Sequence, residues 1–540
     1  MLSRLYALYT KREWLPPVLL AGLAASFVLM ATARGPGLTP DSVFYLATGK
    51  NLAESRGLRM LDGSPLTIFP PGMAVVAAIG ELVVGSGETM SRVIGAVSFF
   101  AIVVLSERLL RRVVSDRAVL LGTTALVAVS PALLGVSKMA WSEAPFIVVC
   151  LASLLLLGQV SHHREAAMWE LGCLVLLCWL AFSLRYAGVS LIAFGAVVLT
   201  FSLQRGGWRV VLMQVGAFVA LASSIPVGWM LRNHAIDGTY LGARETSPDT
   251  LLDGAYRIAG TLGEWILPSA HGDLPPALAA AVGFVGGILA AGLVIHSMKG
   301  QSDRGAECAG EFQATRLAFV YTSLTFVVVY CIYLVVAQLS TAFDPIGPRL
   351  LSPVYVPIVA LAAIGIEGAL TDLQEFRHHL RATGSTVLIV FILGQSIVSV
   401  GHMYDGIING IGYNSRSWAD SELAVAVTAL EEVGTAAIYS NSPSGLWSAT
   451  GIQPLLSSPR RFSARGAPIA DALDDFRREV SCTDRPVYLA LYDRGDVGLY
   501  TAGELRDVID LSAVSDTGDG VLFLVEQPAD RGEPPSCAEP

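Results

Sequence analysis

Ionisable side chains stand beside several apolar segments of this 540-residue chain, where membrane helices would meet water. Asp41 follows the first apolar segment, Glu143 opens a later one, and Arg185 closes the segment after that. Asp344 and Arg349 precede another segment further along the chain. Because an ionisable group at membrane depth is costly and usually functional, a set of them on one side of the membrane is a candidate site.

A carboxylate and two guanidinium groups are suited to a reaction that transfers a group from a phosphate to a hydroxyl. A hydroxyl with a very high pKa attacks an anomeric carbon only if its proton is removed as the bond forms, and a positioned carboxylate can remove it. We predict that Asp41 is this general base. Arg349 and Arg185 are predicted to bind the departing phosphate through charge-assisted hydrogen bonds. The chemistry requires no metal, and we expect no metal site and no cofactor.

Five more residues complete the predicted site. Glu143 is a candidate second acid or acceptor-binding group, and Tyr45, one helical turn beyond Asp41, is a candidate for the same role. Arg232, His234 and Asp344 are candidate substrate-binding residues because they lie at the same predicted side of the membrane.

Each candidate also has a structural interpretation. Asp41 and Glu143 lie near predicted helix starts, where a carboxylate complements the helix dipole. Arg185, Arg232 and Arg349 could extend to lipid headgroups at the interface. The candidates all lie at the same predicted side of the membrane. Several ionisable groups on one side are less easily explained by chance than a single group, and this favours a functional site.

The composition is that of a polytopic membrane protein. Hydrophobic residues make up 53% of the chain, charged residues only 15%, and the mean hydropathy is +0.57. A chain of this kind cannot hide its apolar surface inside a water-soluble core. The net charge of -9 gives no broad basic surface, which argues against nucleic acid as a partner and leaves membrane lipids as the surroundings.

Hydropathy and basic residues predict the topology. Arg4, Lys11 and Arg12 precede the first apolar segment and keep the N-terminus in the cytoplasm, so Asp41 lies outside. That first segment is interpreted as an uncleaved signal anchor. The ~20-residue length that a bilayer demands gives about eleven crossings. They are predicted at residues 15–32, 89–110, 118–136, 144–159, 168–184, 189–203, 210–231, 277–296, 317–338, 350–366 and 387–400.

The first outer loop has its own predicted structure. A proline, Pro40, opens an amphipathic helix that would lie flat at the interface, and the pair Pro70-Pro71 stops it. The apolar segment Phe69 to Val84 is short and begins with proline. We therefore predict a re-entrant or half-inserted segment rather than a full crossing.

From residue 413 the hydrophobic runs shorten, which predicts a transmembrane domain over residues 1–412 and a small extracytoplasmic α/β domain over 413–540. A helix is expected at Ala424 to Val433, and strands at Ala436 to Tyr439, Val487 to Tyr492 and Gly520 to Val525. The domain lacks a phosphate-binding loop or zinc-spaced cysteines, so it helps to bind substrate or caps the core. Cys482 and Cys537 form a disulfide if the domain faces an oxidising compartment, and remain two free thiols otherwise.

Short motifs in this order resemble the GT-C membrane glycosyltransferases, and the likeness is greatest to the branch that contains protein O-mannosyltransferases and the bacterial aminoarabinose and arabinofuranosyl transferases. The matching elements are Pro40-Asp41-Ser42 with Tyr45 and Pro70-Pro71, Ser142-Glu143-Ala144, Arg349-Leu-Leu-Ser-Pro353, and Tyr439-Ser-Asn-Ser-Pro443. The likeness covers most of the membrane part, and it rests on the order and sidedness of the motifs.

The resemblance implies an inverting enzyme with the first-loop acid, here Asp41, as its base. The implied donor is a polyprenyl-phosphate sugar of the arabinofuranose or mannose class, and the acceptor is an envelope glycan, a lipid or a protein. Several relatives carry two adjacent acids in this loop, whereas Ser42 follows Asp41 here. A two-acid or metal-assisted version is therefore not implied, and Glu143 remains the candidate second acid.

These expectations describe a glycosyltransferase of a bacterial cytoplasmic membrane that acts on the outer face. Two other classes stay open: a transporter or flippase of a lipid-linked sugar, and a non-catalytic envelope protein that binds glycan. Transporters often have paired halves with broken helices, and the chain shows no such internal symmetry.

Overall fold

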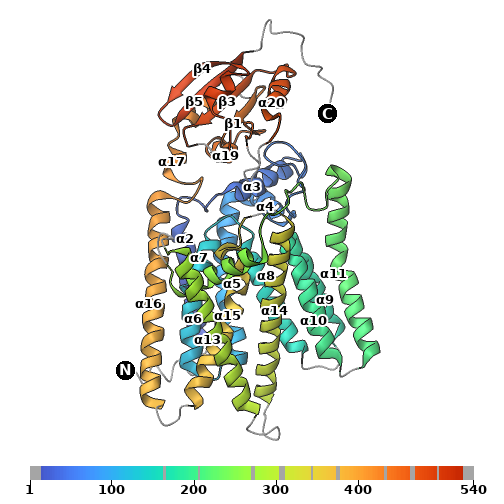
Figure 1. Ribbon diagram of the computed structural model, residues 1–540, viewed down its shortest axis with the longest axis vertical. Helices are drawn as coiled ribbons and strands as arrows, with labels where there is room; N and C mark the ends of the chain where they lie inside the picture. The colour runs from blue at the N-terminus through green and yellow to red at the C-terminus, as the bar shows by residue number, and fades with distance from the viewer. Residues whose placement is uncertain are drawn as a thin grey trace. The chain divides into compact units, whose positions relative to one another are not determined.

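A computed structural model describes residues 14–161, 166–204, 207–268, 274–302, 311–341, 344–372, 377–430, 434–461, 469–494 and 498–526 (Figure 1). The chain forms two compact units, and neither of them is continuous in sequence. Unit 1 holds residues up to 36, 67–73 and 88–408, whereas unit 2 holds 37–66, 74–87 and everything from 409 onward.

Unit 1 is a helical bundle. Its helices are α2 (Leu15–Ala31), α5 (Gly87–Val113), α6 (Arg117–Ala128), α7 (Pro131–Ser137), α8 (Glu143–Val160), α9 (Met168–Leu184), α10 (Val189–Leu203), α11 (Trp208–Asp237), α12 (Leu251–Ile266), α13 (Pro276–Ser302), α14 (Glu311–Ser340), α15 (Pro348–Asp372) and α16 (Arg377–Asn409), with a short 3-10 helix η1 (Tyr186–Gly188) before α10.

The protein is a multi-pass membrane protein. Within the described ranges, eight helices are long and apolar enough to cross a membrane, or nine if the bent pair α6 and α7 is one span. Three apolar helices are shorter, namely α2, α9 and α4 (Gly72–Val84). Every predicted crossing overlaps an observed helix, while the number of helices that cross stays a prediction.

The predicted crossing at 118–136 is broken in the middle. α6 and α7 meet at an angle of 41°, and Ser130 caps α7 by accepting a hydrogen bond from the Leu133 amide at 3.4 Å. The next residue, Pro131, has no N–H to continue the α6 ladder, and its ring clashes with the preceding turn. Proline at the first position of a helix therefore starts a new one.

Helix α12 lies between the predicted crossings at 210–231 and 277–296. Thr250 caps it, with the Asp253 side chain accepting from the Thr250 amide at 2.8 Å. The helix packs closely on α13, because a Cβ at Gly263 would clash with the Ala279 carbonyl oxygen and a Cβ at Gly283 with that of Ala259. Two glycines thus allow this close helix pair.

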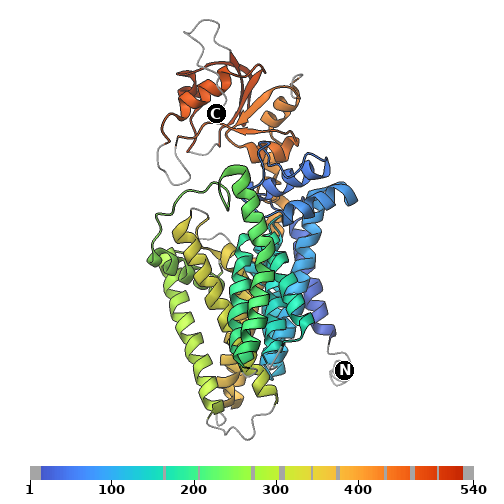
Figure 2. The same ribbon diagram turned by 90° about the vertical axis from the view of Figure 1, so that its right-hand side faces the viewer.

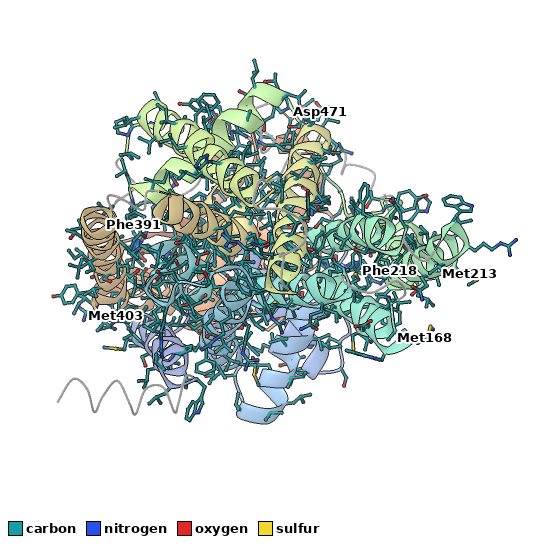
Figure 3. The ribbon with its side chains drawn as sticks, turned by 90° about the horizontal axis from the view of Figure 1, so that it is seen from below. Met168, Met213, Phe218, Phe391, Met403 and Asp471 are labelled. Carbon is teal, nitrogen blue, oxygen red and sulfur yellow. The ribbon has the colours of Figure 1, made fainter. Side chains whose placement is uncertain are left out.

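Helices α9, α10 and α11 run side by side at one edge of the bundle, as Figures 1 and 2 show. In the end-on view of Figure 3, Phe218 lies nearer the middle of the bundle than Met213 of the same helix. Phe218 is 1% exposed and Met213 is 69% exposed. An apolar outer face of this kind suits lipid rather than water.

Unit 2 contains a mixed five-stranded sheet in the order β2-β1-β3-β5-β4. The strands are β1 (Ala437–Ser440), β2 (Leu456–Ser457), β3 (Val487–Tyr492), β4 (Asp510–Thr517) and β5 (Gly520–Glu526). Strand β1 pairs in parallel with β2 and with β3. Strand β5 pairs antiparallel with β3 and with β4. The helices around it are α17 (Arg416–Ala419), α18 (Glu422–Thr428), α19 (Pro443–Thr450), α20 (Ala472–Ser481) and α21 (Ala502–Arg506). The α/β class of this part was predicted correctly.

The central strand β3 is buried along its whole length. Leu489 of β3 packs in a core with Phe476 of α20, Leu505 of α21 and Phe523 of β5. Strand β4 was not predicted. It is an edge strand with a mostly polar sequence, and its residues are largely exposed or half-buried. Edge strands of that kind carry little hydrophobic signal.

The first outer loop folds together with the C-terminal sheet in unit 2. Its helix α3 (Pro40–Ala53) contacts α19, and Lys50 Nζ donates to the Gly451 carbonyl oxygen at 3.3 Å. The loop is also joined to the domain by backbone hydrogen bonds from Tyr413 to Leu38 (3.0 Å) and from Leu455 to Leu61 (3.2 Å). The helix that carries Asp41 is therefore part of the same compact unit as the C-terminal domain.

Candidate active site

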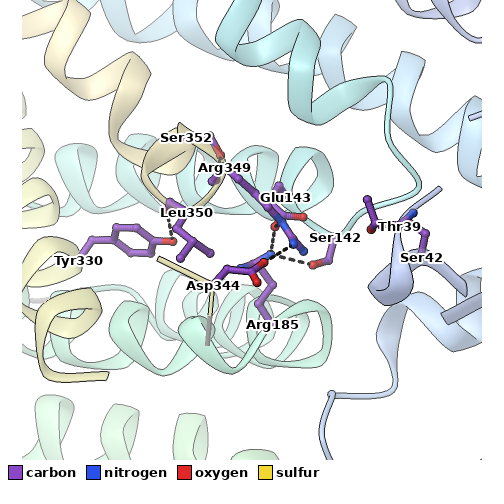
Figure 4. Close-up of polar contacts among 10 residues, drawn as sticks. All are labelled: Thr39, Ser42, Ser142, Glu143, Arg185, Tyr330, Asp344, Arg349, Leu350 and Ser352. Atoms are coloured by element: carbon purple, nitrogen blue, oxygen red, sulfur yellow. Dashed lines mark hydrogen bonds and ion pairs between the residues drawn. The ribbon is translucent and has the colours of Figure 1, made fainter. Parts of the chain in front are cut away.

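A buried carboxylate, Glu143, is the centre of the polar cluster in unit 1 (Figure 4). Its side chain is 1% exposed, and its Oε1 accepts from Arg349 Nε at 2.5 Å and also from Arg185 Nη1. The two arginine side chains are 18% and 15% exposed. The buried carboxylate of Glu143 therefore pairs with two guanidinium groups, and both of these groups remain partly exposed.

The local sequence explains how Glu143 is placed. It is the first residue of α8, and Pro145, which cannot donate to an earlier carbonyl, lies in the same first turn. Ser142 stands at the N-cap, but its Oγ makes no capping bond and accepts from Arg185 Nη1 at 3.2 Å. Ser142 thus helps to orient Arg185.

Arg185 lies at a break between two helices. Its backbone is extended, at φ -151° and ψ 142°, between the end of α9 and the 3-10 turn η1. The turn is so tight that a Cβ at Gly188 would clash with the Phe182 backbone. The sequence Arg185-Tyr-Ala-Gly188 therefore ends one helix and directs the arginine into the cluster.

Arg349 is the second residue of α15, just after Pro348. Pro353, one turn later, has no N–H to donate to the Arg349 carbonyl oxygen. The Ser352 hydroxyl donates to that oxygen instead, at 2.7 Å. The motif Arg349-Leu-Leu-Ser-Pro353 is thus a helix start in which serine replaces the hydrogen bond that proline removes.

A second carboxylate and an aromatic ring also contact Arg349. Its Nη1 donates to Asp344 Oδ2 at 3.0 Å, and the Asp344 side chain is 67% exposed. The guanidinium carbon lies 4.1 Å from the centre of the Trp141 ring, a cation–π contact. Arg349 is therefore held on three sides by Glu143, Asp344 and Trp141.

Aromatic side chains of α14 line the region next to the cluster. Tyr330 is fully buried, its hydroxyl donates to the Leu350 carbonyl oxygen at 3.0 Å, and its ring lies 6.3 Å from that of Phe146. The carbonyl belongs to the residue after Arg349. Apolar rings that exclude water in this way strengthen the neighbouring ion pairs.

The other predicted residues of unit 1 form a separate polar cluster around Asn233. Its Nδ2 donates to the Thr67 carbonyl oxygen at 3.1 Å and to the Tyr186 hydroxyl at 3.0 Å. Arg232 Nη1 donates to Asn233 Oδ1 at 2.9 Å, and the His234 ring stacks on Tyr240 with centres 4.7 Å apart. The structure thus gives Arg232 and His234 protein contacts, and their role in substrate binding stays a prediction.

Asp41 and Tyr45 belong to unit 2. Asp41 lies in the first turn of α3, half-buried, and Tyr45 is 4% exposed in the same helix. Packing fixes α3 on the start of α4, because a Cβ at Gly49 would lie 2.5 Å from Ala77 Cβ and 2.9 Å from the Ala74 carbonyl oxygen. The assignments of Asp41 as the base and Tyr45 as an acceptor-binding group stay predictions.

The switch point of the sheet in unit 2, where ligands bind in many α/β folds, is filled by the protein itself. Asn441, after β1, and Tyr492, at the end of β3, exchange two hydrogen bonds of 2.7 and 2.8 Å. Trp418 of α17 packs on Tyr492, with ring centres 4.9 Å apart. Cys482 ends α20, and Cys537 lies outside the described residues, so the predicted disulfide stays a prediction.

Sequence reasoning missed several residues of the two clusters in unit 1. The roles of Ser142, Tyr330 and Asn233 depend on contacts between helices far apart in the chain. Tyr186 is the residue that joins the clusters, because it follows Arg185 directly and its hydroxyl donates to the Thr67 carbonyl oxygen at 2.6 Å. A helix break flanked by arginine and tyrosine was the available signal.

Solved structures that resemble this one show that the chain has the GT-C fold, which is the fold that the motifs indicated. The structure is similar to that of ArnT from Cupriavidus metallidurans in the apo state, with a TM-score of 0.60 and 13% identity over 94% of this chain and 97% of that one. It is equally similar to ArnT bound to undecaprenyl phosphate, with a TM-score of 0.59 and 14% identity over 98% and 99% of the two chains.

A larger protein shares the same fold. The arabinofuranosyltransferase AftD from Mycobacteria matches with a TM-score of 0.52 and 15% identity, over 96% of this chain but 40% of its own. The sequence matches no protein-family model and no curated protein. At these identities the likeness shows the fold.

Proposed function

We propose that the protein is an inverting glycosyltransferase that moves a sugar from a polyprenyl-phosphate donor to an envelope glycan, lipid or protein. Arabinofuranose or mannose is the proposed class of sugar. The observation that carries the proposal is the pair Arg185 and Arg349, which one buried carboxylate, Glu143, holds together. A paired guanidinium site is suited to the two oxygens of a phosphate.

The electrostatics support this assignment. Two positive charges surround the single buried negative charge of Glu143, the exposed Asp344 balances the second, and both guanidinium groups remain partly exposed. As the bond from the anomeric carbon to the phosphate oxygen breaks, negative charge grows on that oxygen, where positioned arginines stabilise it. This role for Glu143 as the holder of two arginines differs from the acid or acceptor-binding role expected from sequence.

Asp41 is proposed as the base that takes the proton of the acceptor hydroxyl. Asp41 lies half-buried in the first turn of α3, where the helix dipole favours negative charge. Since α3 folds with the C-terminal sheet, the proposed task of that domain is to hold the base helix rather than to carry out chemistry of its own.

The fold likeness favours an enzyme over a flippase, because AftD is named as an arabinofuranosyltransferase. ArnT has also been seen with undecaprenyl phosphate bound, which supports a polyprenyl phosphate as the lipid partner here. We place the site on the outer face of a bacterial cytoplasmic membrane, following the basic N-terminus.

Sugar transfer by the purified protein tests the proposal. Wild type, Asp41→Asn and, as a matched control, Asp62→Asn from the same loop are incubated with radiolabelled polyprenyl-phosphate arabinofuranose or mannose and membrane extract as acceptor. We expect transfer by wild type and the control, and a loss of at least about 10²-fold in Asp41→Asn. No transfer from any donor by wild type would contradict the enzyme assignment, and a fully active Asp41→Asn would contradict the base assignment.

A further inference from the structure

Arg349 binds two carboxylates that have very different surroundings. Glu143 is 1% exposed and is shared with Arg185, whereas Asp344 is 67% exposed and contacts Arg349 through one oxygen at 3.0 Å (Figure 4). Displacing Glu143 would leave a buried charge without a partner, which is costly. Displacing Asp344 costs little, because water can solvate the exposed carboxylate.

The sequence keeps Asp344 close to Arg349 in any case. The two are joined by Pro345-Ile-Gly-Pro348, in which two prolines have fixed φ angles. A short, stiff connection of this kind keeps the carboxylate at a high local concentration around the guanidinium group. Asp344 is therefore a tethered anion that can leave Arg349 and return to it.

We infer that Asp344 is a specificity residue that makes the site prefer a phosphodiester over a phosphomonoester. The inference rests on the proposed function, in which the donor is a lipid phosphodiester and the released lipid is a phosphomonoester. An incoming phosphate takes the place of Asp344 on Arg349 Nη1, and the displaced carboxylate stays nearby because of its tether.

The charges of the two lipids explain the preference. In the donor, one phosphate oxygen bears the sugar and another the lipid, which leaves a single negative charge. Transfer breaks the bond between the anomeric carbon and the phosphate oxygen, forms a bond to the acceptor oxygen, and sends the acceptor proton to the base. The released monoester then carries about -1.5 to -2 near pH 7. Asp344 repels it more strongly than the donor, so the residue opposes product binding and favours release.

Equilibrium binding to the purified full-length protein tests the inference. The probes are undecaprenyl phosphate, a monoester, and its methyl ester, a diester with the same chain. The proteins are wild type, Asp344→Asn, Asp344→Glu, and Asp62→Asn as a control that removes an exposed carboxylate hydrogen-bonded to Ser64 rather than to an arginine. Thermal unfolding in the same detergent checks that each variant is folded.

We expect Asp344→Asn to bind the monoester about tenfold more tightly and the diester about threefold more tightly. The Asp344 charge that the variant removes lies near the phosphate, is partly screened by solvent, and repels the more highly charged monoester more strongly. Asp344→Glu should keep the wild-type preference, and Asp62→Asn should match wild type for both probes. Equal changes for the two probes in Asp344→Asn, or none, would overturn the inference. Wild type that binds neither probe would instead contradict the proposed function.

Discussion

Glu143 and Glu367 are both buried carboxylates that pair with arginine, and their surroundings differ. Glu367, near the end of α15, accepts on Oε1 from the Ser115 amide (2.7 Å), the Ser115 hydroxyl (2.7 Å) and the Asp116 amide (2.6 Å). Its Oε2 lies 3.1 Å from Arg316 Nη1, and the two side chains are 4% and 10% exposed. Glu143 has two arginines instead of one, and both are more exposed.

The comparison separates a structural ion pair from a proposed binding site. At Glu367 one positive charge cancels one negative charge, and neutral donors from the turn between α5 and α6 satisfy the carboxylate. At Glu143 a positive charge is left over and is met by the exposed Asp344. Burial of an ionisable group is therefore a weaker sign of function than a charged group that remains accessible and is paired with an exposed, displaceable partner.

The largest expected effect is on stability at Glu367. Glu367→Ala leaves Arg316 and three donors without their acceptor, so the free energy of unfolding should fall by about 3–5 kcal/mol. Unfolding by SDS in mixed micelles measures it. Asp372→Ala, at the end of the same helix, is the control, and a loss below about 1 kcal/mol in Glu367→Ala would show that the contacts do not act as a structural ion pair.

The next effect is on catalysis at Arg349. Arg349→Gln should lower the rate of sugar transfer by about 10²–10³-fold, as expected when a group that stabilises developing charge is removed. The free energy of unfolding should change by less than about 1 kcal/mol, because Arg185 remains on Glu143. Arg316→Gln should give the opposite pattern, a large loss of stability without a specific loss of phosphate binding. Similar profiles for the two variants would remove the distinction between the sites.

A smaller effect is expected when Glu143 loses its charge but keeps its shape. In Glu143→Gln the guanidinium groups repel each other without a shared anion, and their spacing is no longer fixed. The turnover rate should fall about tenfold through lost positioning, even though the net positive charge rises. Steady-state kinetics at saturating donor measures it. An unchanged turnover rate would mean that Glu143 contributes charge balance alone.

The smallest effect concerns a carboxylate in unit 2, Asp519. Burial acts to raise its pKa, but hydrogen bonds from Ser421, the Leu423 amide and Thr517 outweigh it and hold the pKa below the usual 3.8. The stabilisation is therefore present above pH 3.8 and is lost as the pH falls through the lowered pKa. Because the group is partly solvated, we expect it to contribute less than about 1 kcal/mol.

Hydrogen exchange of β4 and β5 in the full-length protein follows this contribution. The β4 and β5 amides of Asp519→Asn should exchange faster than those of wild type at pH 6. The difference in exchange rate should shrink as the pH falls through the lowered pKa of Asp519. Asp516→Asn, in the same hairpin, is the control. A difference that is independent of pH down to the acid limit would contradict the role given to the Asp519 carboxylate.

Much of the membrane part could be predicted from the sequence, because long apolar runs have few alternatives to spanning helices. The break at Pro131 and the helix α12 were not predicted. A proline inside an apolar run can kink a helix or end it, and an amphipathic helix lacks a continuous apolar run. In the C-terminal sheet, the buried strand β3 was placed correctly, and the polar edge strand β4 was not recognised.

Four of the candidate site residues contact one another in the structure, in an arrangement that the sequence does not predict. The sequence indicates Glu143, Arg185, Asp344 and Arg349 through their places at helix ends, and the structure brings these four together. That one oxygen of Glu143 would receive both arginines depends on the packing of α8, α9 and α15, which sequence spacing does not determine. Arg232 and His234 are also ionisable residues near a helix end, yet they contact a different cluster.

Binding of undecaprenyl phosphate by the purified protein decides whether the guanidinium pair has the role assigned to it. Arg185→Gln and Arg349→Gln should each weaken binding by at least about tenfold, since each loses a charge-assisted hydrogen bond to phosphate. Arg316→Gln, provided that it is folded, should bind like wild type. Wild-type affinity in a protein that carries both Arg185→Gln and Arg349→Gln would show that the lipid phosphate binds elsewhere.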